Sequence, residues 1–159
     1  MISDFAASEL FARTFEEGMD LVEETAAYLD GGGRQDAKLL SRAAALAYAG
    51  ESMRLTTRLM QIASWLLVQR AVREGDMSPQ AACEERYRIG AEAVCLGAAP
   101  SAESEELPFP LLELLDRSAR LYERIRHLDQ RMYLEAAGEA QAPSPVLAQF
   151  DRLKTAFGG

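Results

Sequence analysis

Apolar residues recur every three or four positions along most of this chain, which is the pattern of amphipathic helices that share a core. The clearest stretch runs from 46 to 78 and contains no proline. One stripe comprises Leu46, Gly50, Met53, Thr57, Met60, Ser64, Leu67 and Ala71. A neighbouring stripe comprises Leu55, Leu59, Ile62 and Leu66. An apolar face this wide predicts the central helix of a bundle, packed against at least two other helices.

The opposite side of this helix is polar apart from one tryptophan. Its residues are Glu51, Arg54, Arg58, Gln61, Trp65 and Gln69. An exposed tryptophan beside arginines has the composition of a protein-binding hot spot, so we take Arg54, Arg58, Gln61 and Trp65 as a candidate binding line, called the polar line below. In the other interpretation Trp65 is partly buried between helices. The sequence leaves both open.

Two more long helices are expected on either side of the central one. The first begins at the N-cap Ser8 and ends at Asp30, before Gly31–Gly33. Its inner face comprises Phe11, Phe15, Met19, Val22, Ala26 and Leu29, and its outer face is acidic. The last helix spans 110–136. Its inner face comprises Leu111, Leu114, Leu115, Ser118, Leu121, Tyr122, Ile125, Leu128 and Met132.

The boundaries of the central helix carry a prediction about assembly. Asp36 is its expected N-cap and Gly75 its C-cap, which gives a helix over 37–74. A helix of that length either kinks near Gly50 or protrudes and pairs with a second subunit, so a homodimer is expected. A shorter third helix begins at Ser78-Pro79 and ends near Gly97, with a weakly apolar inner face, and a loop follows to 109.

The last 22 residues differ from the rest. Two prolines, Pro143 and Pro145, precede the apolar residues Val146, Phe150, Leu153 and Phe157 at helical spacing. In one interpretation this tail packs on the bundle or is frayed. In the other it is a tethered amphipathic segment that folds onto a partner, with Phe150, Leu153 and Phe157 as binding residues. The predicted organisation is an all-α antiparallel bundle of three long helices and one shorter helix over 1–137, followed by a flexible tail over 138–159.

Composition narrows the classes of partner. A net charge of −8 and an isoelectric point near 4.8 argue against a protein that binds nucleic acid through its phosphates. No apolar run is long enough to span a membrane and no signal peptide begins the sequence, so we expect a cytoplasmic protein without membrane insertion. Cys83 and Cys95 are expected to be reduced and inert.

Catalytic and metal-binding patterns are missing from the sequence. His127 is the only histidine, and a di-iron bundle needs two Glu-x-x-His units. Neither G-x-x-x-x-G-K-[ST] nor G-x-G-x-x-G, the two glycine motifs that bind phosphate, is present. Gly31–Gly33 follow a predicted helix rather than a strand, so they are not a phosphate-binding loop. We therefore predict a protein that is not an enzyme, with no catalytic residues, no metal and no cofactor.

The run LAYAGESMRLTTRLMQIASWLLVQRAV, followed by GDMS and preceded by FARTFEEGMDLVEETAAYLDGGGR, resembles the regulator-of-CtrA-degradation family of alphaproteobacteria. The resemblance is close over residues 10–90 and looser elsewhere. It implies an RcdA-type adaptor that tethers substrates or further adaptors to the ClpXP protease, which is primed by a response regulator, in control of the cell cycle. It also implies an association with the cell pole.

Two other functions stay open. One is a structural dimer, a scaffold at the cell pole or division site without a delivery role. The other is a regulator that holds an apolar small molecule inside the bundle, next to Met53 and Met60 and the small residues Ala43, Ala47, Gly50 and Ser64. A filled core would exclude the second.

Overall fold

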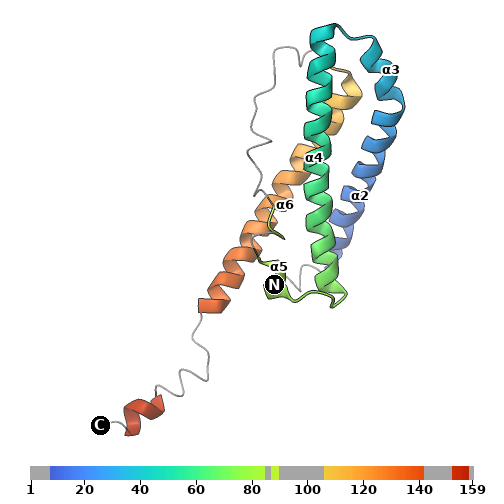
Figure 1. The fold of residues 1–159 in the computed structure, drawn as a ribbon. Helices are drawn as coiled ribbons and strands as arrows, with labels where there is room; N and C mark the ends of the chain where they lie inside the picture. Colours follow the sequence, from blue (N-terminus) through green and yellow to red (C-terminus); the bar gives the residue numbers. More distant parts are fainter. Residues whose placement is uncertain (1–7, 85–86, 90–105, 142–151, 158–159) are drawn as a thin grey trace.

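Three long helices form the body of the protein. The computed structural model describes residues 8–84, 87–89, 106–141 and 152–157 (Figure 1). Helices α2 (Glu9–Asp30), α4 (Arg42–Arg73) and α6 (Phe109–Gln141) each contact the other two. The short helices α3 (Gly32–Lys38) and α5 (Pro79–Ala82) follow α2 and α4. The described residues contain helices and no strand, which confirms the predicted all-α fold.

The helix directions differ in one respect from the antiparallel arrangement that we expected. Helix α2 is antiparallel to α4, but α6 runs in the same direction as α4 (Figure 1). The contacts between these two helices advance together, from Arg58 with Ser118 to Trp65 with Asp129. The 35 residues between the end of α4 and the start of α6 are enough to span the length of the bundle.

Helix α2 begins where the sequence indicated, and its inner face is slightly rotated. Ser8 caps it by accepting a hydrogen bond from the Phe11 N–H at 3.2 Å. Its buried residues are Phe11, Thr14, Gly18, Leu21 and Thr25, whereas the expected inner residue Ala26 is exposed. Gly18 allows α2 to pack closely on α4, because a Cβ atom there would lie 2.6 Å from Cδ1 of Leu66.

The predicted start of the central helix is wrong. Residues 32–38 form the separate helix α3, and α4 begins at Arg42 with Ser41 as its N-cap. Asp36 instead accepts a hydrogen bond from the Tyr28 hydroxyl at 3.0 Å. Gly33 allows this tight turn, because a Cβ atom there would lie 2.5 Å from the hydroxyl oxygen of Tyr48.

Helix α4 is continuous through Gly50 for 32 residues, or about 48 Å. It ends as predicted, because Gly75 adopts a positive φ of 80° that favours glycine. None of the helices in the described ranges is long and apolar enough to cross a membrane.

The third helix is much shorter than predicted. Ser78 caps α5 as expected, but α5 has only four residues and Tyr87–Ile89 are not α-helical. The expected inner face of this helix is only weakly apolar, so a long helix would bury little apolar surface here. In the structure Arg88 contacts Asp129 of α6, and Ile89 is buried. The rest of that prediction, and most of the following loop, lies outside the described residues.

The inner face of α6 is confirmed. Leu111, Leu114, Ser118, Leu121, Tyr122, Ile125 and Met132 are buried, and Leu115 and Leu128 are half-buried. The helix continues past the expected end at 136, through Gly138 to Gln141. The division into a bundle over 1–137 and a tail over 138–159 stays a prediction.

Candidate protein-interaction surfaces

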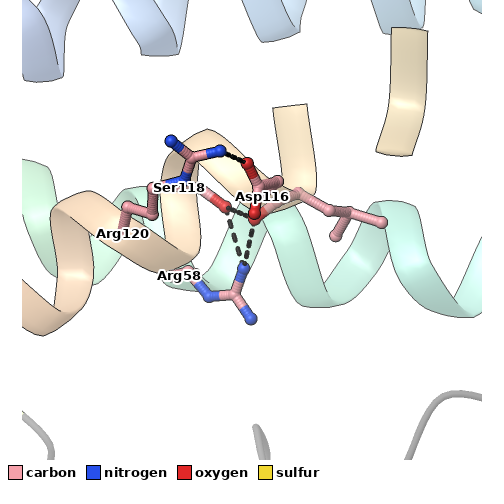
Figure 2. A network of polar contacts seen from close by, with 5 residues as sticks. Arg58, Asp116, Ser118 and Arg120 are labelled. Carbon is pink, nitrogen blue, oxygen red and sulfur yellow. Dashed lines mark hydrogen bonds and ion pairs between the residues drawn. The ribbon is translucent and has the colours of Figure 1, made fainter. Parts of the chain in front are cut away.

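The polar line of α4 faces α6 rather than solvent. Arg58 is half-buried, and its Nη1 donates hydrogen bonds to the Leu115 carbonyl oxygen at 3.1 Å and to the Ser118 hydroxyl at 2.8 Å (Figure 2). Burial lowers the pKa of the Arg58 guanidinium from its usual value. Asp116 and Arg120 form an ion pair beside this contact, within α6 (Figure 2). Arg58 therefore joins two helices of the bundle.

Trp65 is only 2% exposed. Its Nε1–H donates to Oδ1 of Asp129 at 3.1 Å, and Nε of Arg88 donates to Oδ2 of the same carboxylate at 3.3 Å. The Arg88 guanidinium also lies 3.9 Å from the ring centre of Tyr133, as a cation–π contact. Burial raises the pKa of Asp129, although the hydrogen bond from Trp65 and the charge of Arg88 oppose this shift.

The other two residues of the polar line are also partly covered. Arg54 forms an ion pair with Glu51 at 3.4 Å, and both side chains are mostly buried. Gln61 is half-buried. The structure thus brings all four residues onto the side of α4 that packs in the bundle, which agrees with the core interpretation of Trp65. Binding of a partner by these four residues stays a prediction.

The sequence did not identify Ser118 and Asp129 as the acceptors for Arg58 and Trp65. The apolar pattern places Ser118 on the inner face of α6 but indicates no polar role for it. Asp129 follows Ile125 by four positions and precedes Met132 by three, so it lies on the inner face of the helix. A carboxylate on the inner face of a helix needs a hydrogen-bond donor from a neighbouring element, and this position is the feature of the sequence that could have identified Asp129.

The stripe predicted to be buried is the exposed surface of α4. Leu46, Met53, Met60 and Leu67, called the outer stripe below, are between 51% and 71% exposed. They are seven residues apart, so they follow one line along the helix. The reason is that α2 and α6 cover the side of α4 from Leu55 and Leu59 round to Trp65, and no other helix of the described ranges covers the outer stripe.

A surface cavity of about 320 Å³ lies between α2 and α4. Its walls include Val22, Thr25, Leu29, Asp30, Leu59 and Met60. It is bordered by the outer stripe, because Met60 belongs to both. The Thr25 hydroxyl is buried and has no hydrogen-bond partner in the described part of the chain.

Part of the acidic face of α2 is used inside the molecule. Arg117 of α6 pairs with Glu24 at 2.8 Å, and Arg124 pairs with Glu17. The hydrogen bond from Arg117 lowers the pKa of the Glu24 carboxyl. These pairs hold α2 against α6 at the protein surface.

The tail residues lie partly outside the described ranges. Residues 152–157 form a short helical segment in which Leu153 is 54% and Phe157 83% exposed. Phe150 lies outside the described residues. The two that are described present apolar surface to solvent.

The histidine, cysteine and acidic side chains that could take part in catalysis or metal binding do not form a cluster in the described ranges. His127 is exposed, with Nε2 at 3.9 Å from a Glu123 oxygen. The described ranges contain no group of three histidine, cysteine or acidic residues placed to hold a metal ion. Burial raises the pKa of the half-buried Cys83 thiol, which disfavours the reactive thiolate. Cys95 lies outside the described residues.

Comparisons with known proteins give two findings and one negative result. The model of a family described as "Protein of unknown function (DUF1465)" matches residues 2–157. A crystal structure of RcdA from Caulobacter crescentus CB15 matches with 67% sequence identity and a TM-score of 0.68. That match covers 83% of this chain and 98% of the RcdA chain. No curated protein matches.

Proposed function

This chain belongs to the DUF1465 family and to the family of RcdA, and from that membership we propose that it is a non-enzymatic protease adaptor. The observation that supports the proposal most strongly is 67% identity over nearly the whole of the solved RcdA chain. At that identity the two proteins have about two thirds of their aligned residues in common, so a shared role is the simplest expectation.

The partners in this proposal follow from the family resemblance. The adaptor tethers substrates or further adaptors to the ClpXP protease, primed by a response regulator, in bacterial cell-cycle control. It works in the cytoplasm and associates with the cell pole. An adaptor needs at least two binding surfaces that can be occupied together. The exposed tail residues supply one apolar surface, and each subunit of the homodimer proposed below would carry its own tail.

We assign partner binding to the tail, through Phe150, Leu153 and Phe157. Leu153 and Phe157 are four residues apart and share one face of the segment, as in helices that bind grooves. The experiment is a capture from the lysate of the source cells, read by quantitative mass spectrometry. Its baits are the full chain, the 1–141 truncation and Leu153→Ser/Phe157→Ser.

Recovery of ClpX, ClpP and a response regulator with the full chain is the expected result, with at least one class of partner lost from both tail variants. A matched control is Leu134→Ser, which changes an exposed leucine of α6 and should capture the same proteins as the full chain. Recovery of only the bait and polar or division proteins would favour the alternative function, a structural scaffold dimer.

We also propose that the protein forms a homodimer through the outer stripe. Apolar residues seven apart are the pattern by which helices pair, and small residues beside them allow close approach. Ala49, Gly50 and Ser64 are exposed next to the stripe. Met53→Arg/Met60→Arg should convert the dimer to a monomer in sedimentation equilibrium, whereas Leu134→Arg should not. A dimer that survives the double variant would exclude this surface.

A further inference from the structure

The cavity between α2 and α4 and the C-terminal helical segment have complementary chemistry. We propose that residues 152–157 dock into this cavity of the same chain. The contact requires neither the protease nor a dimer, so it stands apart from the proposed adaptor function.

The cavity needs an apolar occupant. Its volume of about 320 Å³ is at the lower end of the range for binding pockets. Val22, Leu29, Leu59 and Met60 supply apolar walls. The Thr25 hydroxyl oxygen is buried beneath this lining and is not open to an occupant. A large apolar side chain therefore fits the lining.

The α2 side of the cavity is acidic. Asp30 lines the cavity and forms an exposed ion pair with Arg34 at 3.8 Å. Glu23 and Glu16 continue the same line of carboxylates along α2, about 10 and 21 Å before Asp30. All three are exposed. An occupant with cations beside its apolar residues is therefore favoured over an acidic one.

The segment 152–157 has this combination. Leu153 and Phe157 are both exposed and share one face, while Arg152 and Lys154 lie beside them without an acidic residue in the segment. So short a helix is unstable alone in water, because nucleation costs more than a few hydrogen bonds return. A surface that buries Leu153 and Phe157 would stabilise its helical form.

The connecting chain is long enough. Asp129 of α6 contacts Trp65 of α4, and the two helices run in the same direction while α6 slants away from α4 toward its C-terminus (Figure 1). Gln141 lies about 18 Å beyond Asp129 along α6, and Met60 about 8 Å back from Trp65 along α4. With about 8–10 Å between the two axes at the contact, the path from Gln141 to Met60 is at most about 36 Å. Residues 142–151 span up to about 33–36 Å when extended. A tether of this length holds the segment at high effective concentration near the cavity.

Docking has a consequence for assembly. A segment seated against Met60 covers part of the outer stripe, so docking within one chain and pairing of two chains through α4 exclude each other. The tail would then be available to a partner only when it leaves the cavity. This consequence alone rests on the proposed homodimer.

The test is a spin-label experiment on the full chain. Cys83→Ala and Cys95→Ala leave Gly159→Cys as the attachment point for a nitroxide, and ¹³C-labelled methionine methyl groups report its position. We expect the Met60 signal to lose most of its intensity and to recover when the nitroxide is reduced. Met132, which is nine residues from the end of α6 and therefore close to a free tail, should lose less.

Three comparisons make the result specific. Leu153→Ser/Phe157→Ser should restore the Met60 signal, and Asp30→Lys should reduce its loss by about two- to fivefold. Asp76→Lys, the same charge change in the exposed turn after α4, should leave the loss as in wild type. In a mixture of spin-labelled and ¹³C-labelled chains Met60 should keep its intensity.

Two results would overturn the proposal. The first is a Met60 signal that keeps its intensity in the labelled chain, or loses less than Met132, because the tail then samples only the end of α6. The second is an equal loss of Met60 in the mixture, because the occupant then comes from a second copy.

Discussion

Arg58 and Trp65 each carry an N–H group into the contact between α4 and α6, and each finds an acceptor there. Arg58 donates to Leu115 and Ser118, and Trp65 donates to Asp129. Buried polar groups are costly only when they lack partners, so these bonds make the polar line compatible with the interior of a bundle. At the scale of the residue, hydrogen bonds orient α6 on α4.

Arg58→Ala should lower the free energy of unfolding by about 1–3 kcal/mol, because the Leu115 carbonyl and the Ser118 hydroxyl lose a shared donor in a partly buried place. Arg13→Ala is the control, because that arginine is exposed and pairs with Glu9 one turn away in the same helix. It should cost less than about 0.5 kcal/mol. Urea unfolding followed by Trp65 fluorescence measures both. Unchanged stability with lost partner binding would support the binding interpretation of the polar line instead.

Asp129 should make stability depend on pH in a definite direction. Its folded pKa is raised above the unfolded value near 3.9, mainly by burial, so the folded state takes up a proton first as pH falls. The stability of wild type relative to Asp129→Asn should therefore increase as pH falls from 7 toward 4. Urea unfolding of both proteins at several pH values measures this difference. A relative stability that falls over the same interval would show that the charged form is favoured.

At the scale of the element, α4 explains why the sequence predicted some faces and not others. The inner face of α6 follows one apolar series in which Ser118 and Asp129 are the buried polar positions, so its direction could be predicted. Helix α4 offers apolar residues on two sides, and its most polar side also carries Trp65. Periodicity alone cannot decide which sides receive a neighbour, because the deciding contacts, such as Arg58 with Ser118, come from residues about 60 positions away.

The ends of elements show the same division. Ser8, Ser78 and Gly75 act through their own backbone and the next turn, so they were predictable as caps. The break between α3 and α4 falls at 39–41, where the Ser41 hydroxyl accepts from the Ala44 N–H. Asp36, the expected cap, instead accepts from the Tyr28 hydroxyl, a contact with the preceding helix that no local pattern indicates. At the tail, spacing identified Leu153 and Phe157, which are exposed in the structure, and their role in binding stays a prediction.

The packing of α2 on α4 predicts opposite effects for two glycine substitutions. Gly18→Ala should destabilise the protein by about 1–3 kcal/mol, because the new methyl group would overlap Cδ1 of Leu66 at 2.6 Å. In the monomeric Met53→Arg/Met60→Arg background, Gly50→Ala should stabilise the protein by about 0.5–1 kcal/mol, because nothing lies within 4 Å in the described part of one chain and alanine favours the helix. Thermal unfolding by circular dichroism measures both. A stabilising Gly18→Ala would contradict the packing of α2 on α4.

At the scale of the whole molecule, a bundle of three long helices leaves two kinds of apolar surface outside its core. One is the rigid outer stripe on α4, and the other is the short segment 152–157 beyond the end of α6 (Figure 1). We propose that these surfaces bind other proteins. The match to RcdA, at 67% identity, supports a role in regulated proteolysis.

The most direct test of the adaptor proposal is the rate of substrate degradation in a reconstituted reaction. ClpXP, the response regulator and a captured substrate are mixed with or without the full chain, and the substrate half-life is measured. The adaptor proposal predicts a shorter substrate half-life with the full chain and little shortening with Leu153→Ser/Phe157→Ser. A half-life that the full chain leaves unchanged, under conditions in which ClpXP degrades a substrate that needs no adaptor, would contradict it.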